Sequence, residues 1–337
     1  MAQTVTIGAA ELEALIAAAL VASNTAEANA RSVARALAQA EIDGQKGHGL
    51  SRVPTYAAQA RAGKVDGHAA PVVRQTRTCA LMIDVANGFA FPAIDLGIER
   101  LPGLASAGGI AAAGFLRSHH FGVVGRHVER LAEAGLLALA FGNTPKAIAP
   151  WGGKRALFGT SPLAFAAPRR NAPPIVVDMA LSQVARGKIL TAGQRGEPIP
   201  AGWAVDEQGR PTTDPAAALK GALQPIGGAK GAALALMVEV LAVALTGAHF
   251  GYEASSFFDA EGPPPGVGQL LVAIDPSAFA GRDFFLDRIA ALAAMLQADT
   301  GARLPGSRRL AERAKAEREG VTVDAALLAE ARALAGL

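Results

Sequence analysis

The sequence predicts a mixed α and β fold in which the strands lie in the middle of the chain. Its 337 residues are enough for two domains, or for one large domain with a lobe. Hydrophobic residues make up 51% of the chain and charged residues 18%, as in compact folded enzymes. Short apolar runs occupy the centre, and stretches with apolar residues three and four positions apart lie around them.

Helices are predicted first in the chain. Residues 9–42 form two alanine-rich helices, because Leu12, Leu15 and Ile16 recur at helical spacing before a polar break at 23–28. No basic segment precedes these helices, so we interpret the first as a helix and not as a signal peptide.

A third helix is predicted after the glycine-rich segment GQKGHG, residues 44–49. Ser51 stands at its N-cap position, Pro54 suits a first turn, and Gly63 ends it.

The rest of the chain alternates between strands and helices. Apolar runs separated by turn-rich segments predict strands at residues 78–84, 109–117, 136–142, 163–168, 174–180 and 269–275. Helical patterns frame them at residues 91–101, 122–135, 231–247, 284–298, 311–320 and 324–337. The sequence contains no internal repeat.

Composition and charge exclude several functions. The longest apolar stretch, from Gly231, is interrupted by Glu239 and cannot cross a ~30 Å hydrocarbon layer without burying a charge, so we predict a core helix and no membrane partner. A net charge of +3 without a basic run argues against nucleic acid. The single Cys79 excludes a disulfide framework within the chain and favours a reducing, cytoplasmic setting. We expect a small-molecule partner and no metal.

Two nucleotide-binding motifs are missing from the sequence. It contains neither GxGxxG nor GxxxxGK followed by Ser or Thr. Any nucleotide is therefore expected to bind to a non-Rossmann architecture.

The segment GQKGHGLSR contains the first candidate site. His48 and Arg52 are four residues apart at a helix start, which places them within one turn of each other. A guanidinium can hold a carboxylate while an imidazole delivers a proton at neutral pH. The alternative is a solvated His48 beside an Arg52 that belongs to a surface ion pair.

Two further segments favour phosphate binding. In RSHHFGVVGRH, residues 117–127, a glycine-bounded turn opens a helix, and backbone N–H groups there suit a phosphate. A packed histidine or a metal site is the alternative, and we interpret His119 as a bystander. In RLPGSRR, residues 303–309, three arginines around a Pro-Gly turn would favour NADPH over NADH, unless the loop is simply solvated.

Taken together, these segments resemble the malate and L-lactate dehydrogenase-like oxidoreductases, a non-Rossmann family. The resemblance extends nearly from end to end, in GHGLSRVPTYAAQARAGKVDG, SHHFGVVG, GNTPKAIAPWGGK, GTSPLAFAAP, VVDMALSQVARGKI, IPAGWAVDEQGRPTTDP, GGAKGAALALMVEVL and RLPGSRR. Within the family, SSFFDAEGPPPGVGQLLVAIDP looks most like the Δ1-pyrroline-2-carboxylate and Δ1-piperideine-2-carboxylate reductases. Those enzymes use NADPH to reduce cyclic ketimine carboxylates to L-proline or L-pipecolate, as part of proline metabolism.

The resemblance implies a role for particular residues. It makes His48 the proton donor, and it makes Arg52, Thr160, Gly187 and Lys188 substrate contacts. The implied cofactor is NADPH, with NADH possible, bound by His120, Phe121, Gly122, Val123, Val124, Asp178, Met179, Ala180, Arg303, Leu304, Pro305, Gly306, Ser307, Arg308 and Arg309.

Two positions depart from the ketimine reductases. Those enzymes usually carry a serine directly before the histidine and an aspartate after the later RG pair, as a relay that orients the imidazole. Here these positions are Gly47 and Lys188, so the relay cannot be transferred. A lysine also occupies the second position in the hydroxyacid dehydrogenase branch. Something else, such as a backbone carbonyl, would then set the tautomer of His48.

The resemblance also implies an architecture. A largely antiparallel central sheet forms the NADPH-binding lobe, residues 116–280, and both chain ends, residues 1–115 with 281–337, build a helical lobe for substrate binding and dimerisation. The implied assembly is a homodimer. We therefore predict an NADPH-dependent reductase of small cyclic ketimine carboxylates. The alternatives are an NAD(P)-dependent 2-hydroxyacid dehydrogenase of the malate, lactate or ureidoglycolate type, and a nucleotide-binding protein without catalysis.

Overall fold

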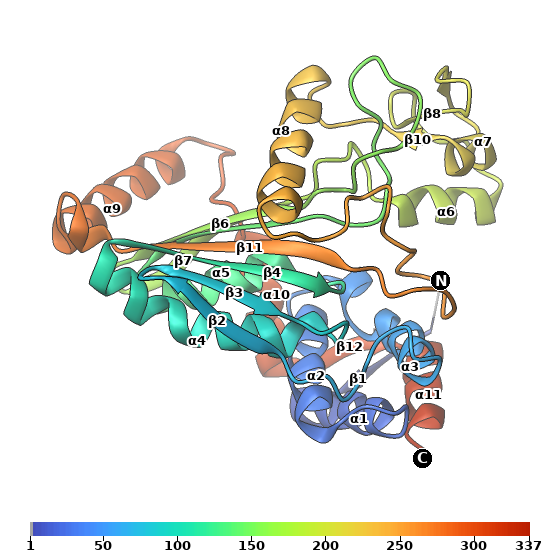
Figure 1. Ribbon diagram of the computed structural model, residues 1–337, viewed down its shortest axis with the longest axis horizontal. Helices are drawn as coiled ribbons and strands as arrows, with labels where there is room; N and C mark the ends of the chain where they lie inside the picture. Colours follow the sequence, from blue (N-terminus) through green and yellow to red (C-terminus); the bar gives the residue numbers. More distant parts are fainter. Residues whose placement is uncertain (1–2) are drawn as a thin grey trace.

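A seven-stranded sheet forms the centre of the protein (Figure 1). In this computed structural model, which describes residues 3–337, the strand order is β2-β3-β4-β11-β5-β6-β7. Only β3 and β4 pair in parallel, and the other neighbours in the sheet are antiparallel. The prediction of a largely antiparallel sheet is confirmed. The strands are β2 (Val72–Arg77), β3 (Ala80–Asp84), β4 (Ile110–Ser118), β5 (Leu137–Gly142), β6 (Leu163–Arg169), β7 (Ala172–Met179) and β11 (Val267–Ile274).

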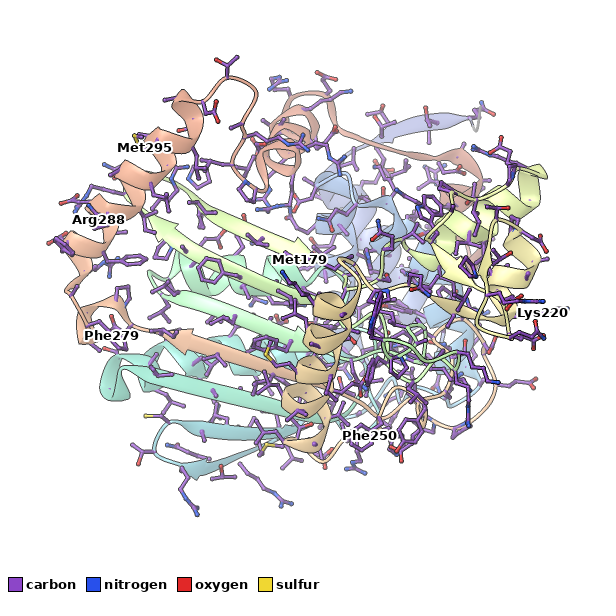
Figure 2. All side chains as sticks on the ribbon, turned by 90° about the horizontal axis from the view of Figure 1, so that it is seen from above. Met179, Lys220, Phe250, Phe279, Arg288 and Met295 are labelled. Atoms are coloured by element: carbon purple, nitrogen blue, oxygen red, sulfur yellow. The ribbon has the colours of Figure 1, made fainter. Side chains whose placement is uncertain are left out.

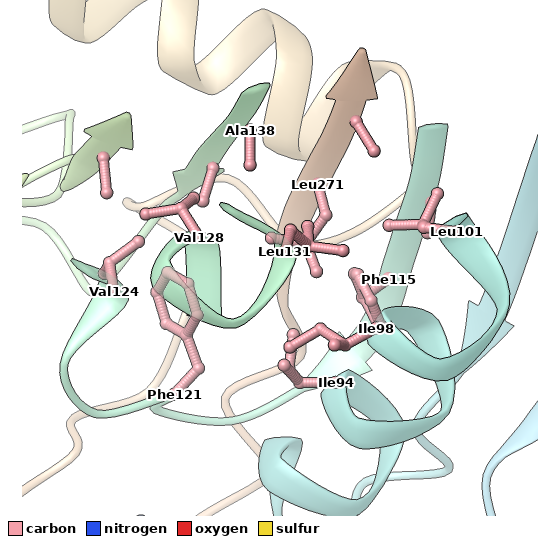
Figure 3. Close-up of a cluster of buried hydrophobic side chains, with 14 of the residues drawn as sticks. Ile94, Ile98, Leu101, Phe115, Phe121, Val124, Val128, Leu131, Ala138 and Leu271 are labelled. Atoms are coloured by element: carbon pink, nitrogen blue, oxygen red, sulfur yellow. The ribbon is translucent and has the colours of Figure 1, made fainter. Parts of the chain in front are cut away.

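Two helices, α4 (Ala90–Gly108) and α5 (Val124–Glu133), cover one face of this sheet. Figure 3 shows Ile98 from α4 and Leu131 from α5 meeting Phe115 and Leu271 from the strands. Gly97 lets α4 approach closely, since a Cβ there would lie 2.8 Å from the Phe115 ring. Burying each of these large side chains contributes roughly 1.5–3 kcal/mol, and this core fixes the strands that lead to the site.

The helical lobe is built from both ends of the chain, as predicted. Strand β1 (Thr4–Ile7) pairs antiparallel with β12 (Val321–Asp324), and the two lie beside α1 (Ala9–Val21), α2 (Glu27–Ile42), α3 (Val53–Arg61) and α11 (Ala325–Leu334) in Figure 1. Leu12 and Ile16 from the N-terminal end share one buried cluster with Leu328 from the C-terminal end. The two short strands were not predicted.

A smaller lobe packs on the other face of the sheet. It contains α6 (Arg186–Arg195), α7 (Pro215–Lys220), α8 (Ala229–Glu239) and a three-stranded sheet in the order β10-β8-β9, and α8 continues as a π-helical segment, η3 (Val240–Ala244). The short strands are β8 (Ala204–Val205), β9 (Pro211–Thr212) and β10 (Ala222–Leu223).

The prediction of a core helix at 231–247 is only half right. Ala235 and Val238 are buried on one side, but Leu236 is 53% exposed and Leu245 63% exposed on the other. Apolar residues occur on every side of this helix. The sequence therefore cannot show that only one side packs against the rest of the protein. A second helix with exposed apolar side chains is α9 (Arg282–Ala298), where Met295 is 73% exposed.

Two other sequence interpretations need correction. The predicted boundary at residue 115 falls inside β4, and β2 and β3 belong to the central sheet and not to the helical lobe, because their hydrogen bonds continue the sheet. Ser51 is not an N-cap: it lies inside a 3-10 turn, Leu50–Arg52, and its hydroxyl donates to the Lys46 carbonyl. Within residues 3–337, no helix is long and apolar enough to cross a membrane.

Candidate active site

His48 lies in a glycine-rich loop between α2 and α3, at the end of a 3-10 turn, Lys46–His48. A buried carboxylate supports this loop from below: Glu41 accepts a hydrogen bond from the Leu50 backbone N–H at 2.7 Å and pairs with Lys46 at 2.7 Å. A Cβ at Gly49 would collide with the Glu41 carboxylate, so this position requires glycine. Gly49 therefore allows the tight loop that carries His48.

The His48 ring is held by other rings. It stacks on His120 with centroids 5.3 Å apart and an angle of 5° between the planes. The buried Tyr56 hydroxyl, from α3, hydrogen-bonds to Nδ1 of His120 at 2.5 Å. The Nδ1 atom of His48 is itself buried and has no hydrogen-bond partner in the described part of the chain. The stack positions His48 and leaves its buried Nδ1 without an internal hydrogen bond among the described residues.

Burial keeps this histidine cluster neutral. Desolvation first, and then the positive charge of Arg52, lowers the pKa of His48 to about 4. The same two effects hold the pKa of His120 well below its ordinary value, and burial lowers the pKa of His119 to about 3. At neutral pH the imidazole of His48 is therefore a base, and Arg52 is the fixed positive charge beside it.

Arg52 is free to bind an anion. Its Nε donates to the Gly47 carbonyl at 2.8 Å, and its guanidinium lies 5.2 Å from the centre of the Phe258 ring. Among residues 3–337 it forms no ion pair with a carboxylate, so the alternative of a surface pair does not hold. A guanidinium without an internal counter-ion beside a neutral base suits a small carboxylate substrate.

Thr160 lies in the loop that enters β6. Its backbone N–H donates to the Thr144 hydroxyl at 2.9 Å, and the buried Glu239 accepts a bond from the preceding Gly159 at 3.3 Å. Glu239, which interrupts the long apolar stretch from Gly231, therefore holds the loop that carries Thr160. Burial raises the pKa of Glu239, although the backbone hydrogen bonds oppose this shift.

The other two predicted substrate contacts lie elsewhere. Gly187 and Lys188 are exposed at the start of α6 and line a cavity of about 380 Å³ together with Trp203. No hydrogen bond or ion pair of the described residues joins them to His48. Their role as substrate contacts stays a prediction.

The three predicted cofactor segments do converge. Asp178 accepts a hydrogen bond from the Gly125 backbone N–H at 2.8 Å, which joins the end of β7 to the start of α5. The loop 303–309, which leads into α10 (Ser307–Glu319), closes a cavity of about 400 Å³ over this junction. Phe121 and Val124 point into the hydrophobic core, so those two residues can offer a cofactor only their backbone.

Arg309 does not act as a free phosphate clamp. It donates to Glu129 at 2.8 Å and lies 3.4 Å from Asp43, and Arg313 pairs with the same two carboxylates. Burial alone would raise the pKa of Glu129, but hydrogen bonds from Arg313 and Arg309 outweigh it and hold the pKa at about 2. Asp43 and Glu129, which are buried and distant in sequence, thus neutralise Arg309, one of the three arginines predicted to bind phosphate.

The remaining donors fit a nucleotide phosphate. Arg303 and Arg308 are exposed and line the cavity, and Ser307 begins the 13-residue helix α10 at its edge. Gly306 adopts a φ of +85°, which turns the chain into that helix. Among the described residues, no cluster of three or more His, Cys, Asp or Glu could hold a metal ion.

The fold, together with the similar proteins described next, identifies an oxidoreductase that uses a nicotinamide cofactor. Comparison with known proteins identifies the family: residues 7–332 match the one described as malate/L-lactate dehydrogenase, and the chain belongs to that family.

Similar proteins include both dehydrogenases and reductases. A (2R)-3-sulfolactate dehydrogenase (NADP+) from Chromohalobacter salexigens is 51% identical over 325 residues, which cover 96% of each chain. A Δ1-pyrroline-2-carboxylate/Δ1-piperideine-2-carboxylate reductase from Pseudomonas putida is 43% identical over 318 residues, covering 93% of this chain and 92% of the relative. The crystal structure of Δ1-piperideine-2-carboxylate reductase from Pseudomonas syringae pvar. tomato has a TM-score of 0.92 and 38% identity, covering 98% of this chain and 99% of the other.

Sequence reasoning missed the aromatic surroundings of His48. Tyr56 is four residues after Arg52, which is the N-cap of α3, so its place near Arg52 could have been inferred. Phe257 packs against the rings of His119 and His120 at 5.1 and 5.4 Å, although it is more than 130 residues away in sequence. His119, interpreted as a bystander, is buried among these rings. No local pattern signals such long-range contacts.

Proposed function

We propose that the protein is an NADP-dependent dehydrogenase of small 2-hydroxy acids, which it converts reversibly to 2-oxo acids. The observation that carries this proposal is the neutral His48 beside the unpaired Arg52. When bound, NADP+ supplies the acceptor for the hydride that leaves the substrate carbon. His48 takes the hydroxyl proton, so that the C–O bond becomes a carbonyl while one proton and one hydride depart.

Arg52 has two roles in this proposal. It holds the carboxylate of the substrate through charge-assisted hydrogen bonds, which places the hydroxyl near His48. Its own charge contributes to the low pKa of His48. A bound carboxylate offsets that charge and raises the pKa of His48, which prepares the imidazole to receive the proton.

Two further features support a 2-hydroxy acid with a second anionic group. The relative from Chromohalobacter salexigens is named for sulfolactate. Lys188 occupies the position at which ketimine reductases usually carry an aspartate, and a lysine there resembles the hydroxyacid dehydrogenase branch. We propose Lys188, with Gly187 and Thr160, as substrate-binding residues.

The second candidate is an NADPH-dependent reductase of cyclic ketimine carboxylates, with a place in proline metabolism. Its support is the segment 255–276, which resembles those reductases and whose Phe257 and Phe258 lie against His120 and Arg52. In this reaction His48 supplies the proton to the substrate nitrogen. The neutral imidazole and the absent relay at Gly47 and Lys188 make it the weaker candidate.

We propose that NADP is the physiological cofactor. Arg303 and Arg308 would hold its additional phosphate, while Asp178 to Ala180 and the backbone from His120 to Val124 would contact the rest of the nucleotide. The single, partly buried Cys79 fits a reducing, cytoplasmic setting.

A substrate panel tests the two candidates. Oxidation of sulfolactate, malate and lactate with NADP+ and NAD+ is compared with reduction of Δ1-pyrroline-2-carboxylate and Δ1-piperideine-2-carboxylate with NADPH and NADH. We expect the highest kcat/KM with a 2-hydroxy acid and NADP+. A higher kcat/KM for either ketimine would establish the second candidate instead.

We also propose a homodimer. The exposed apolar side chains of α8 and α9 lie on the same side of the central sheet, and Figure 2 shows Met295 and Phe279 at its outer edge. A twofold axis would let one copy cover the same apolar side chains of its partner. Sedimentation velocity should give twice the mass of one chain, and Met295→Glu should shift the species toward the monomer. A wild-type monomer at micromolar concentration would refute this assembly.

A further inference from the structure

A buried lysine joins α3 to the loop 254–263. Lys64 is 2% exposed, and its ammonium donates to the carbonyls of Ser256, Asp259 and Glu261 at 2.8, 2.9 and 3.0 Å. Burial lowers the pKa of Lys64, and the charge of Asp259 opposes that shift. An ammonium has three donors, and here all three are used by backbone carbonyls of one loop.

Gln59, also buried and located on α3, strengthens this link. Its side-chain amide donates to the carbonyls of Phe257 and Asp259 at 2.9 and 3.0 Å. The loop has no helix or strand of its own between the π-helical segment and β11. Two side chains of the helical lobe therefore satisfy its inward-facing carbonyls, which would be costly to bury without partners.

This loop forms one wall of the site. Phe257 packs against His119 and His120, and the ring of Phe258 lies under the guanidinium of Arg52. Apart from its contact with the ring, the guanidinium of Arg52 makes one hydrogen bond within residues 3–337, to the Gly47 carbonyl. The direction of its guanidinium thus depends on where the loop holds Phe258.

We infer that Lys64 and Gln59 are positioning residues: they fix the loop 254–263 so that Phe258 orients Arg52 toward the substrate carboxylate. The inference rests on the proposed function in one respect, the carboxylate-binding role of Arg52. An uncharged residue would avoid the desolvation of a buried ammonium, but it could not hold three carbonyls at once. The nucleotide cavity is built from other segments, so loss of the link leaves it intact.

The test uses the full-length enzyme and three variants. Lys64→Met keeps the length of the side chain but removes its donors, and Phe258→Leu removes the ring but keeps the link. Lys220→Met is the matched control, because Lys220 is exposed on α7 at the far edge of Figure 2 and its side chain has no hydrogen bond or ion pair within residues 3–337.

Three readouts separate positioning from a general loss of structure. Hydrogen–deuterium exchange in 254–263 should rise in Lys64→Met only. The KM for the carboxylate substrate should rise about tenfold in both Lys64→Met and Phe258→Leu, equivalent to about 1.4 kcal/mol, while the Kd for NADPH changes less than twofold. In an NMR titration, the pKa of His48 should move upward in Lys64→Met, since Arg52 is then less firmly held nearby.

Each outcome has a distinct meaning. Unchanged exchange in Lys64→Met, or raised exchange with a KM and a His48 titration equal to those of Lys220→Met, would overturn the inference. If Lys64→Met does not fold, Gln59→Leu replaces it under the same criteria. If the wild-type enzyme oxidises no 2-hydroxy acid, the proposed function fails, while loop exchange and the His48 titration still decide the inference.

Discussion

The proposed catalytic pocket and the proposed nucleotide cavity obtain their properties in opposite ways. Around His48, rings remove water, and burial lowers the pKa of each clustered histidine, so the pocket is neutral apart from Arg52. Around Arg309, four charged side chains cancel one another in a buried cluster. The comparison teaches that the arginine-rich loop 303–309 supplies structure, through Arg309, as well as the proposed phosphate binding. The proposed chemistry depends instead on the uncharged imidazole of His48.

The largest expected effect concerns the neutral pocket. His48→Ala should lower kcat by about 10²- to 10⁴-fold, because the substrate hydroxyl loses its base. The Kd for NADPH, measured by fluorescence, should stay within twofold of the wild type. Equal kcat values in the variant and the wild type would remove His48 from the mechanism.

The charged cluster should respond in stability. Glu129→Ala leaves Arg309 and Arg313 with fewer carboxylate partners, and breaking a buried ion pair in this way costs about 3–5 kcal/mol. Urea unfolding measures the loss. Glu133→Ala is the control, because Glu133 forms only a partly exposed pair with Arg126 and should change the free energy of unfolding little. If both variants lost a similar free energy of unfolding, the buried cluster would contribute no more to stability than the partly exposed ion pair.

Mild acid should destabilise the pocket before it affects the ion cluster. Unfolded histidines bind protons near pH 6.5, whereas the pKa of His48 and His127 is about 4 in the folded protein and that of His119 about 3. The contribution of these histidines to the free energy of unfolding is therefore fully present above pH 6.5 and is lost as the pH falls toward 4. The slope is about 1.4 kcal/mol per pH unit for each such histidine.

Urea unfolding at pH 7.5, 6.0 and 5.0 measures this slope. His119→Phe keeps an aromatic ring in this position but removes one titrating group. The free energy of unfolding of this variant should therefore fall less steeply with decreasing pH, by about 1.4 kcal/mol per pH unit. A free energy of unfolding that does not change between pH 7.5 and 5.0 would show that the cluster is solvated and charged.

The smallest expected effect concerns the cofactor phosphate. Replacing Arg303 and Arg308 together with Ala should raise the KM for NADPH by about tenfold, or about 1.4 kcal/mol, and that for NADH less. Arg309→Ala should instead lower the free energy of unfolding, because its guanidinium belongs to the buried cluster. Equal changes in KM for both cofactors after the double replacement would reject phosphate recognition by this loop.

Local patterns predicted most of the sheet and the start of the site. Six apolar runs became strands of the central sheet. The single helical turn predicted for His48 and Arg52 was wrong: they end two successive 3-10 turns, Lys46–His48 and Leu50–Arg52, because the non-helical Gly49 lies between them. Strands β1 and β12 were missed because each is short and partly exposed, so neither shows a clear apolar pattern.

Long-range contacts account for what the sequence could not predict. The fate of Arg309 depends on Asp43 and Glu129, which are 266 and 180 residues away in the chain. Lys64 resembles any surface lysine until its three carbonyl partners are known. Such contacts arise from the packing of distant segments, and single-residue properties do not contain them.

The pairing of β1 with β12 has a consequence for synthesis of the enzyme. Thr4 lies opposite Asp324, and Lys46, two residues before His48, donates to the carbonyl of Thr322. The loop that carries His48, the proposed base, therefore cannot acquire this hydrogen bond until Thr322 has been synthesised, after all seven strands of the central sheet.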